Sequence, residues 1–173
     1  MGDISGRYLD AGCAFGLLLN EVRGFFSELH GFDISKYAIG KAVERTREVD
    51  LKVLDLNERL PYHDESFDCI TALDILEHTN SFSDSLGRLA AKLKRGGHMI
   101  ISSPLNEWPH KLFGFLDRDD THISIPKESE IKDIVKQHRL TIIKEEKYAA
   151  LPNYIRLPFI PAVIELYTKK ESV

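Results

Sequence analysis

The sequence predicts an α/β fold: a doubly wound sheet of seven strands, mostly parallel, that ends in an antiparallel pair. Three observations support this prediction. Short apolar runs alternate with stretches whose apolar residues recur at helical spacing, a pattern typical of a parallel sheet with helices on both faces. A turn containing Gly12 and Gly16 follows the first apolar run, where a first helix would begin. The last two apolar runs have no convincing helix between them, so we expect them to pair antiparallel at the sheet edge.

The first half of the chain predicts three strands and two helices. Tyr8-Leu9 belongs to a first strand. Apolar residues at spacings of four, three, one and three then predict one face of a helix: Leu18, Val22, Phe25, Phe26 and Leu29. GFDIS at 31–35 is a second strand, apolar spacing over roughly 36–48 predicts a second helix, and LKVLDL at 51–56 is a third strand.

The second half continues this alternation. A helix that begins near Phe82 is expected to end at Gly96-Gly97, because glycine commonly terminates helices. A last helix surrounds Ile131, and residues 105–127 before it are expected to form a lid-like insertion. The remaining strands are expected at residues 67–75, 98–104, 140–148 and 162–170.

Length and composition are those of an ordinary globular protein. The chain has 173 residues, so we expect a single domain over residues 1–173. Lys plus Arg is 23 and Asp plus Glu is 27, and the net charge of −4 argues against a nucleic-acid partner. Two cysteines, no signal peptide and no apolar run near the ~18 residues of a membrane span favour a cytoplasmic protein without stable membrane insertion. Nothing in the sequence predicts the oligomeric state.

The turn LDAGCAFG at 9–16 lacks the marks of a phosphate-binding loop. It does not have the GxGxxG spacing of a dinucleotide-binding loop, and no lysine follows Gly16 as it would in a P-loop. We interpret it as a loop whose glycines let the backbone approach a ligand that has no phosphate chain. The alternative is a plain turn between a strand and a helix.

Acidic residues end the first three predicted strands: Asp10, Asp33 and Asp55. In an open parallel sheet these ends meet at one rim, where ligands bind. Asp33 can accept two hydrogen bonds from a ribose diol, or it can be a solvated acid before the next helix, where Ser35 is the better cap. Asp55 and the Leu56 amide can contact an adenine edge beside an apolar wall from Ile34. Asp55 can equally be a surface acid.

Five segments resemble the class I S-adenosylmethionine-dependent methyltransferases, and the resemblance covers residues 7–170: LDAGCAFG, GFDIS, LDLN, LPYHDESFDCITALDILEH and LKRGGHMIISSP. The stretch from Leu60 through His78 is the most specific, and it is similar to the ubiquinone-biosynthesis-like (type 11) branch. The resemblance implies a Rossmann-like fold, S-adenosyl-L-methionine as cofactor, S-adenosyl-L-homocysteine as product and a small-molecule acceptor.

The implied cofactor-binding residues, with Ile34 added as the apolar wall, are Asp10, Gly12, Gly16, Asp33, Asp55, Leu56 and Leu73. The glycines would lie under the methionine moiety with Asp10 bracing the loop, and Leu73 would line the sulfonium side. Ala14 stands where the family usually has a middle glycine, and we expect it at negative φ. The first strand begins near residue 7, so the covering helices that usually precede it in the family are expected to be absent.

DILEH at 74–78 is the candidate for chemistry on the acceptor. On a helical turn, Asp74, Glu77 and His78 would share one face. His78 could then act as a general base oriented by a carboxylate, or the three side chains could bind a divalent ion such as Mg²⁺. In a third alternative, Glu77-His78 caps the next helix or forms an ion pair with it.

His122, in DRDDTHIS at 117–124, is the second candidate catalytic residue, because members of the resembled family often carry a histidine there; a charged solvated loop is the alternative. Aromatic residues at 105–119 suit a planar or apolar acceptor, or they anchor the loop. The predicted function is methyl transfer to a small molecule, at oxygen, with no metal ligand assigned. The alternative is a cofactor-binding module, or partner subunit, without its own acceptor site. A nicotinamide oxidoreductase would require the missing GxGxxG.

Overall fold

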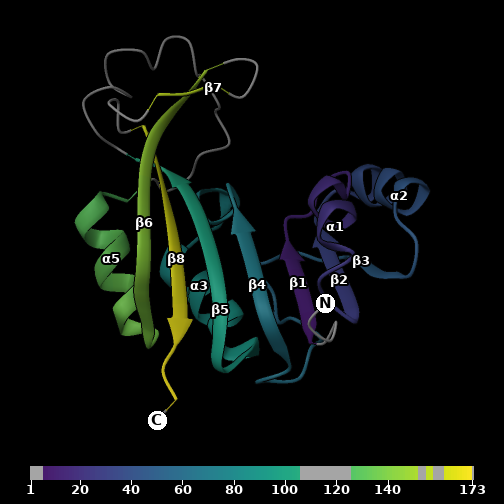
Figure 1. The fold of residues 1–173 in the computed structure, drawn as a ribbon, viewed down its shortest axis with the longest axis horizontal. Helices are drawn as coiled ribbons and strands as arrows, with labels where there is room; N and C mark the ends of the chain where they lie inside the picture. The colour runs from purple at the N-terminus through teal and green to yellow at the C-terminus, as the bar shows by residue number, and fades with distance from the viewer. Residues whose placement is uncertain (1–5, 106–125, 152–154, 158–161, 173) are drawn as a thin grey trace.

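The structure is a computed structural model that describes residues 6–105, 126–151, 155–157 and 162–172. Its strands lie in one twisted sheet with helices around it (Figure 1). The strands are β1 (Arg7–Ala11), β2 (Glu28–Asp33), β3 (Val49–Val53), β4 (Phe67–Leu73), β5 (Leu93–Pro104), β6 (Leu140–Leu151), β7 (Ile155–Leu157) and β8 (Val163–Lys170). The helices are α1 (Leu17–Val22), α2 (Lys36–Arg45), the 3₁₀ helix η1 (Leu76–His78), α3 (Phe82–Lys92) and α5 (Glu128–Gln137).

The strand order is β3-β2-β1-β4-β5-β8-β6-β7. Strands β1 to β5 are parallel, and β8 lies antiparallel between β5 and β6. The order of the chain reverses between β1 and β4, which is the switch point where open sheets bind ligands. The predicted sheet and its antiparallel last pair are confirmed. The short β7, which pairs with the end of β6, is an addition that the sequence does not predict.

Side chains point alternately to the two faces of the sheet along each strand, and apolar side chains lie on both faces. Leu9 belongs to a buried cluster with Leu86 of α3 and Ile131 of α5. Its neighbour Tyr8 belongs to a second cluster with Leu19 of α1 and Ile39 of α2. Because neighbouring residues in a strand point to opposite faces, both faces must be covered to bury these side chains. Each large apolar side chain contributes about 1.5–3 kcal/mol when buried, and this burial accounts for the doubly wound arrangement.

The first helix is shorter than predicted, and Leu29 lies in β2 instead. The helix ends at Val22, and the amide of Phe25 donates to the Val22 carbonyl in a turn. The amides of Ser27 and Glu28 then donate to the Gly6 carbonyl, which leads the chain into β2. The prediction from apolar spacing was therefore wrong for the residues after Val22: it assigned the start of a strand to the end of a helix.

Two other boundaries also differ from the prediction. Strand β3 ends at Val53, so Asp55 does not end the strand but lies in the turn after it. Helix α3 ends at Lys92 rather than at Gly96-Gly97, and those glycines lie inside β5. The Lys170 ammonium donates to the carbonyls of Ala90 at 2.8 Å and Leu93 at 2.7 Å. A side chain from β8 therefore satisfies carbonyls at the end of this helix, a position where the sequence predicts a glycine cap.

Most of the expected insertion at 105–127 lies outside the described residues, and so does His122. The aromatic residues assigned to the insertion are among those not described. Within the described part of the chain, no helix has the length and apolar character that crossing a membrane requires.

Candidate functional site

The switch point of the sheet holds a cavity of about 370 Å³. It lies at the carboxyl ends of β1, β2 and β4 and beside the turn after β3. Seven predicted site residues line it: Gly12, Asp33, Ile34, Asp55, Leu56, Leu73 and His78. Asp10 and Gly16 do not line the cavity. Asp74, which the sequence proposed as part of the DILEH candidate, also lines it, and five further lining residues were given no site role from the sequence: Ala14, Leu54, Asn57, Ile75 and Thr79.

The glycine loop is held by β2 and packed against α2. The amides of Gly12 and Cys13 both donate to the Phe32 carbonyl at 2.9 Å. Gly16 has φ of 72°, and a Cβ on it would lie 2.9 Å from Cγ2 of Thr46. Both its left-handed φ and its close packing against the end of α2 therefore require glycine. Gly12, which lines the cavity, also has a positive φ of 76°, and a Cβ on it would lie 2.7 Å from Cδ1 of Ile75.

Ala14 adopts a positive φ of 42°, so the expectation of negative φ is wrong. The physical reason is a hydrogen bond: this conformation directs the Ala14 amide to Oδ2 of Asp33 at 3.0 Å. Left-handed φ is unfavourable for alanine and is kept only where other contacts support it. The loop is thus tied to the end of β2 by a side chain that also lines the cavity.

Asp33, at the end of β2, is hydrogen-bonded both to the glycine loop and to the residue that caps α2. Besides Ala14, its Oδ1 accepts from the Ser35 amide at 2.8 Å. Ser35 caps α2 by accepting from the Ala38 amide at 3.2 Å, so Asp33 is not the helix cap. Each carboxylate oxygen has a second lone-pair direction, which leaves acceptor capacity for a ligand.

The turn after β3 is organised by Asp55 and Asn57. Oδ1 of Asp55 accepts from the Asn57 amide at 2.8 Å and from its side-chain nitrogen at 2.9 Å. Oδ1 of Asn57 accepts from the Asn80 amide at 2.8 Å and so connects this turn to the segment after η1. The adjacency of Asn57 to Asp55 in LDLN is the signal that could have identified it. Among the described residues, the Leu56 amide has no hydrogen-bond acceptor.

The DILEH segment does not form the shared face expected for it. Asp74 precedes η1 at a positive φ of 50°, and its Oδ1 accepts from Oγ of Ser102 on β5 at 2.7 Å. Glu77 is buried, and only Asp74 and His78 line the cavity. Within the described residues, no three side chains of metal-ligand type lie together. The arrangement of these three side chains therefore does not fit a magnesium site.

Asp10 lies beneath the loop, 3% exposed, where Oγ1 of Thr71 donates to its Oδ1 at 2.7 Å. The Tyr8 hydroxyl contacts the same Thr71 oxygen at 2.6 Å, which gives a buried chain of three polar groups. Burial raises the pKa of Asp10 from 3.8 to about 6, and the nearby Asp33 carboxylate adds to this effect. Desolvation of the charged form is the larger cause.

We expect the raised pKa of Asp10 to reduce stability as the pH rises. Below about pH 4 the carboxyl is protonated in both states, whereas between about pH 4 and pH 6 only the folded state keeps the proton. The contribution of Asp10 to the free energy of unfolding should therefore fall by about 3 kcal/mol across this interval and stay level above it. Asp10→Asn should remove that fall, as measured by urea unfolding at several pH values. Glu58→Gln, at an exposed acid in the loop after β3, is the control. An unchanged pH dependence in Asp10→Asn would contradict the assignment.

A second cavity of about 390 Å³ adjoins the first and shares Leu73 and Asp74 with it. Its wall is apolar where α1 supplies Leu18 and Val22, and Glu165 of β8 adds a carboxylate that is 8% exposed. The hydroxyl of Tyr148 donates to Oε2 of Glu165 at 3.1 Å. Of the site residues predicted from the sequence, Leu73 and Asp74 line this cavity. The rest of its wall could not be predicted, because it is assembled from strands and a helix far apart in the chain.

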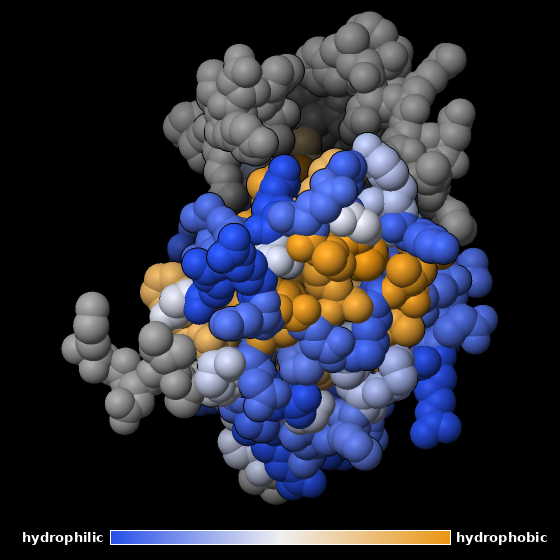
Figure 2. Space-filling view, turned by 90° about the vertical axis from the view of Figure 1, so that its right-hand side faces the viewer, coloured by the Kyte–Doolittle hydropathy of each residue, from blue (hydrophilic) through white to orange (hydrophobic). Residues whose placement is uncertain are grey.

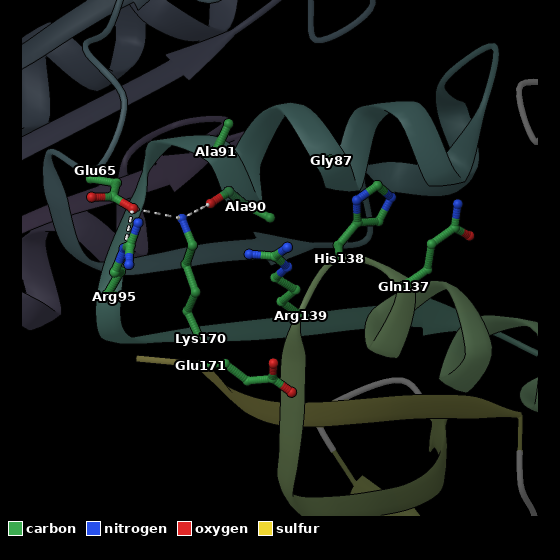
Figure 3. A pocket seen from close by; sticks show the side chains of 10 residues that line it. All are labelled: Glu65, Gly87, Ala90, Ala91, Arg95, Gln137, His138, Arg139, Lys170 and Glu171. Carbon is green, nitrogen blue, oxygen red and sulfur yellow. Dashed lines mark hydrogen bonds and ion pairs between the residues drawn. The ribbon is translucent and has the colours of Figure 1, made fainter. Parts of the chain in front are cut away.

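A third cavity, of about 320 Å³, lies at the opposite end of the sheet (Figure 3). Three of its charged groups pair with one another: Nε of Arg95 lies 3.0 Å, and Nζ of Lys170 3.9 Å, from Oε1 of Glu65. None of the predicted site residues lines it. We therefore place the candidate site at the switch point.

Comparison with known proteins identifies the family and the fold of the chain. The chain matches the family described as "Methyltransferase domain" over residues 3–145. It is similar to a ubiquinone biosynthesis O-methyltransferase of Alkalilimnicola ehrlichii, with 32% identity over 133 residues, which cover 73% of this chain and 53% of the relative. A protein of the same name from Bradyrhizobium sp. is 32% identical over 106 residues, 59% of this chain and 41% of that protein. The chain spans about half the length of the curated relatives it matches.

Solved structures share the fold. A chain of the complex between the Haloferax volcanii Trm112 methyltransferase activator and a methyltransferase superposes with a TM-score of 0.82 at 14% identity, covering 98% of this chain and 85% of that one. An S-adenosylmethionine-dependent methyltransferase from Archaeoglobus fulgidus gives a TM-score of 0.75 at 22% identity, covering 95% and 86%. At these identities the likeness concerns the fold alone.

Proposed function

This chain belongs to the methyltransferase-domain family, and from that membership we propose that it transfers a methyl group from S-adenosyl-L-methionine to a small-molecule acceptor, at oxygen. The observation that carries the proposal is the cavity at the switch point, where the glycine loop, Asp33 and Asp55 meet. We propose that residues 1–173 act as one cofactor-binding domain in the cytoplasm.

The charge of the cavity suits this cofactor. Of the described residues that line it, three are carboxylates, and none is lysine or arginine: Asp33, Asp55 and Asp74. S-adenosyl-L-methionine carries a sulfonium and an ammonium group and has no phosphate, so a carboxylate-lined cavity attracts it. The same cavity would repel a dinucleotide.

The residues of the cavity fit the parts of the cofactor in order. Asp33 has acceptor capacity for the two ribose hydroxyls, Asp55 and the Leu56 amide can pair with the adenine edge, and Ile34, 68% exposed, offers an apolar wall. Gly12 and Leu73 would then lie beside the methionine part. Asp10 and Gly16 support the loop from behind, and we assign them a positioning role rather than direct contact.

Methyl transfer needs alignment more than chemical assistance. The cofactor supplies a good leaving group, so the protein has to hold the acceptor atom in line, an effect that can contribute up to about 7–11 kcal/mol. His78 lines the cavity, and we propose it as the base that takes the acceptor proton. The assignment of His122 rests on the sequence alone.

We propose that the acceptor occupies the second cavity. It shares Leu73 and Asp74 with the cofactor cavity, and its apolar wall with a carboxylate suits a small hydroxylated aromatic compound. Oxygen as the methylated atom is supported by relatives named O-methyltransferases.

A second candidate function is that of a partner subunit. One structural neighbour comes from a complex with a methyltransferase activator, and the chain spans about half of its curated relatives. In this case the chain would bind the cofactor but would methylate no acceptor on its own. Turnover by the purified chain with catechol as acceptor would contradict this second candidate, which predicts binding without turnover.

Both candidates predict that the cofactor stabilises the fold. A ligand at one hundred times its dissociation constant adds about 2.7 kcal/mol to the free energy of unfolding. S-adenosyl-L-homocysteine should therefore raise the Tm by roughly 5–10 °C in a thermal-shift measurement. NADH is the control, because the cavity lacks a phosphate-binding loop. No shift, together with no heat in calorimetry at millimolar ligand, would remove both candidates.

A further inference from the structure

Strand β3 is the outermost strand at its end of the sheet, and it pairs only with β2 among the described residues. Its outer backbone groups are therefore available to another strand. Its sequence, Val49-Asp50-Leu51-Lys52-Val53, alternates apolar and charged residues. Val53 is 48% exposed, so this edge presents an apolar side chain to solvent.

The charges of β3 are complementary to the same strand run in reverse. If two copies pair antiparallel with Leu51 opposite Leu51, each Asp50 faces the other copy's Lys52, and each Val49 faces Val53. Within one chain, Lys52 already forms an ion pair with Asp50, and His30 contacts Asp50 at 3.1 Å. A two-fold arrangement would extend this pair into a ring of four alternating charges on one face of the joined sheet.

Helix α2, which packs on β2 and β3, presents a second unexplained feature. Gly40 lies in the middle of this helix and is exposed, and a Cβ built on it would meet nothing within 4 Å. Packing within the chain therefore does not require glycine, although glycine costs a helix about 1 kcal/mol relative to alanine. Val43, one turn further on, is 60% exposed. A small residue beside an exposed apolar one suits the close approach of a second helix.

Gly40 and Val43 lie on the side of α2 away from α1. The opposite side is marked by Tyr37, whose ring meets Phe15 edge-on at 6.3 Å, and by Arg45, which donates to the Phe15 carbonyl. The space-filling view of this end of the molecule shows an apolar area surrounded by polar residues (Figure 2). Val53 at the edge of β3 and Val43 on α2 are both exposed apolar residues.

We propose that two copies of this chain associate through the β3 edge, antiparallel about Leu51, with the two α2 helices meeting at Gly40 and Val43. The pairing would continue the sheet from one copy into the other. Two separate cofactor cavities would remain, one in each copy. The inference does not depend on the proposed function.

Sedimentation velocity of the whole chain at high micromolar concentration tests the proposal. The wild-type chain is expected to be a dimer. Asp50→Lys places four positive charges in the ring and Lys52→Asp four negative ones, so each variant alone should dimerise at least about tenfold more weakly. An equimolar mixture of the two variants should restore the dimer, because each acid then again faces a lysine.

The controls separate the interface from folding. Arg95→Glu, in β5 and away from both β3 and α2, breaks an exposed ion pair with Glu65 whose charged atoms lie 3.0 Å apart, and should leave dimerisation unchanged. Gly40→Leu should fold, since its side chain enters open space, yet it should weaken the dimer. A monomeric wild-type chain, or variants of β3 that dimerise normally, would overturn the proposal. A mixture of charge variants that stays monomeric while both fold, by circular dichroism, would also overturn it.

Discussion

Asp33→Ala is expected to weaken the binding of S-adenosyl-L-homocysteine by at least about a hundredfold. Two hydrogen bonds from ribose hydroxyls to a carboxylate contribute about 1.5–3 kcal/mol each. The substitution also removes the acceptor of the Ala14 amide, so the loop loses the contact that supports its positive φ. Both effects act in the same direction. Isothermal calorimetry measures the dissociation constant directly.

Two variants make this measurement specific. Asp84→Ala removes an exposed acid in the first turn of α3, outside the cavity, and should leave the affinity unchanged. Asp33→Asn keeps one acceptor oxygen, so its loss should be smaller than that of alanine. A folded Asp33→Ala protein with wild-type affinity would show that the ribose contact is misassigned.

His78→Ala is expected to reduce turnover about 10²–10⁴-fold while the affinity for the cofactor stays unchanged. This range is the usual contribution of a positioned general base. His78 lies at the end of η1 and lines the cofactor cavity, but none of the hydrogen bonds proposed for the ribose or the adenine uses its side chain. Its loss should therefore affect the acceptor proton rather than those contacts. The measurement follows methyl transfer from labelled S-adenosyl-L-methionine to catechol.

The matched control is His63→Ala, at an exposed histidine in the loop before β4 that does not line the cavity. Turnover should stay at the wild-type level there. Full turnover in His78→Ala would show that the acceptor loses its proton without this residue, and alignment alone would then account for the rate.

Those parts of the fold and site that follow from local pattern could be predicted from the sequence. The carboxyl ends of parallel strands meet at one rim, so the positions of Gly12, Asp33 and Leu73 followed from the strand assignments alone. Asp55 reached the same cavity although β3 ends two residues earlier, because the turn after the strand directs it there. The predicted place of Asp55 in the site was therefore correct although the predicted end of the strand was wrong.

Features set by tertiary contacts could not be predicted. Ala14 has positive φ because of an acceptor nineteen residues away in the chain. The end of α3 depends on a lysine from β8, and the second cavity combines residues of β1, β4, β5, β6 and β8 with α1. Burial of Glu77 and the bond from Ser102 to Asp74 separate side chains whose spacing favoured one face. Each of these features depends on contacts between residues far apart in the chain, and the spacing of apolar residues carries no information about such contacts.

The insertion of β8 between β5 and β6 affects how the chain folds during synthesis. Until residues 163–170 have left the ribosome, no strand of the described residues joins β6 to the rest of the sheet, and the edge of β5 that β8 will cover is open. Strands β1 to β5 can assemble early, whereas the last third of the protein must wait. A nascent chain arrested before residue 163 should therefore protect its first five strands from protease but leave residues 140–151 open to cleavage.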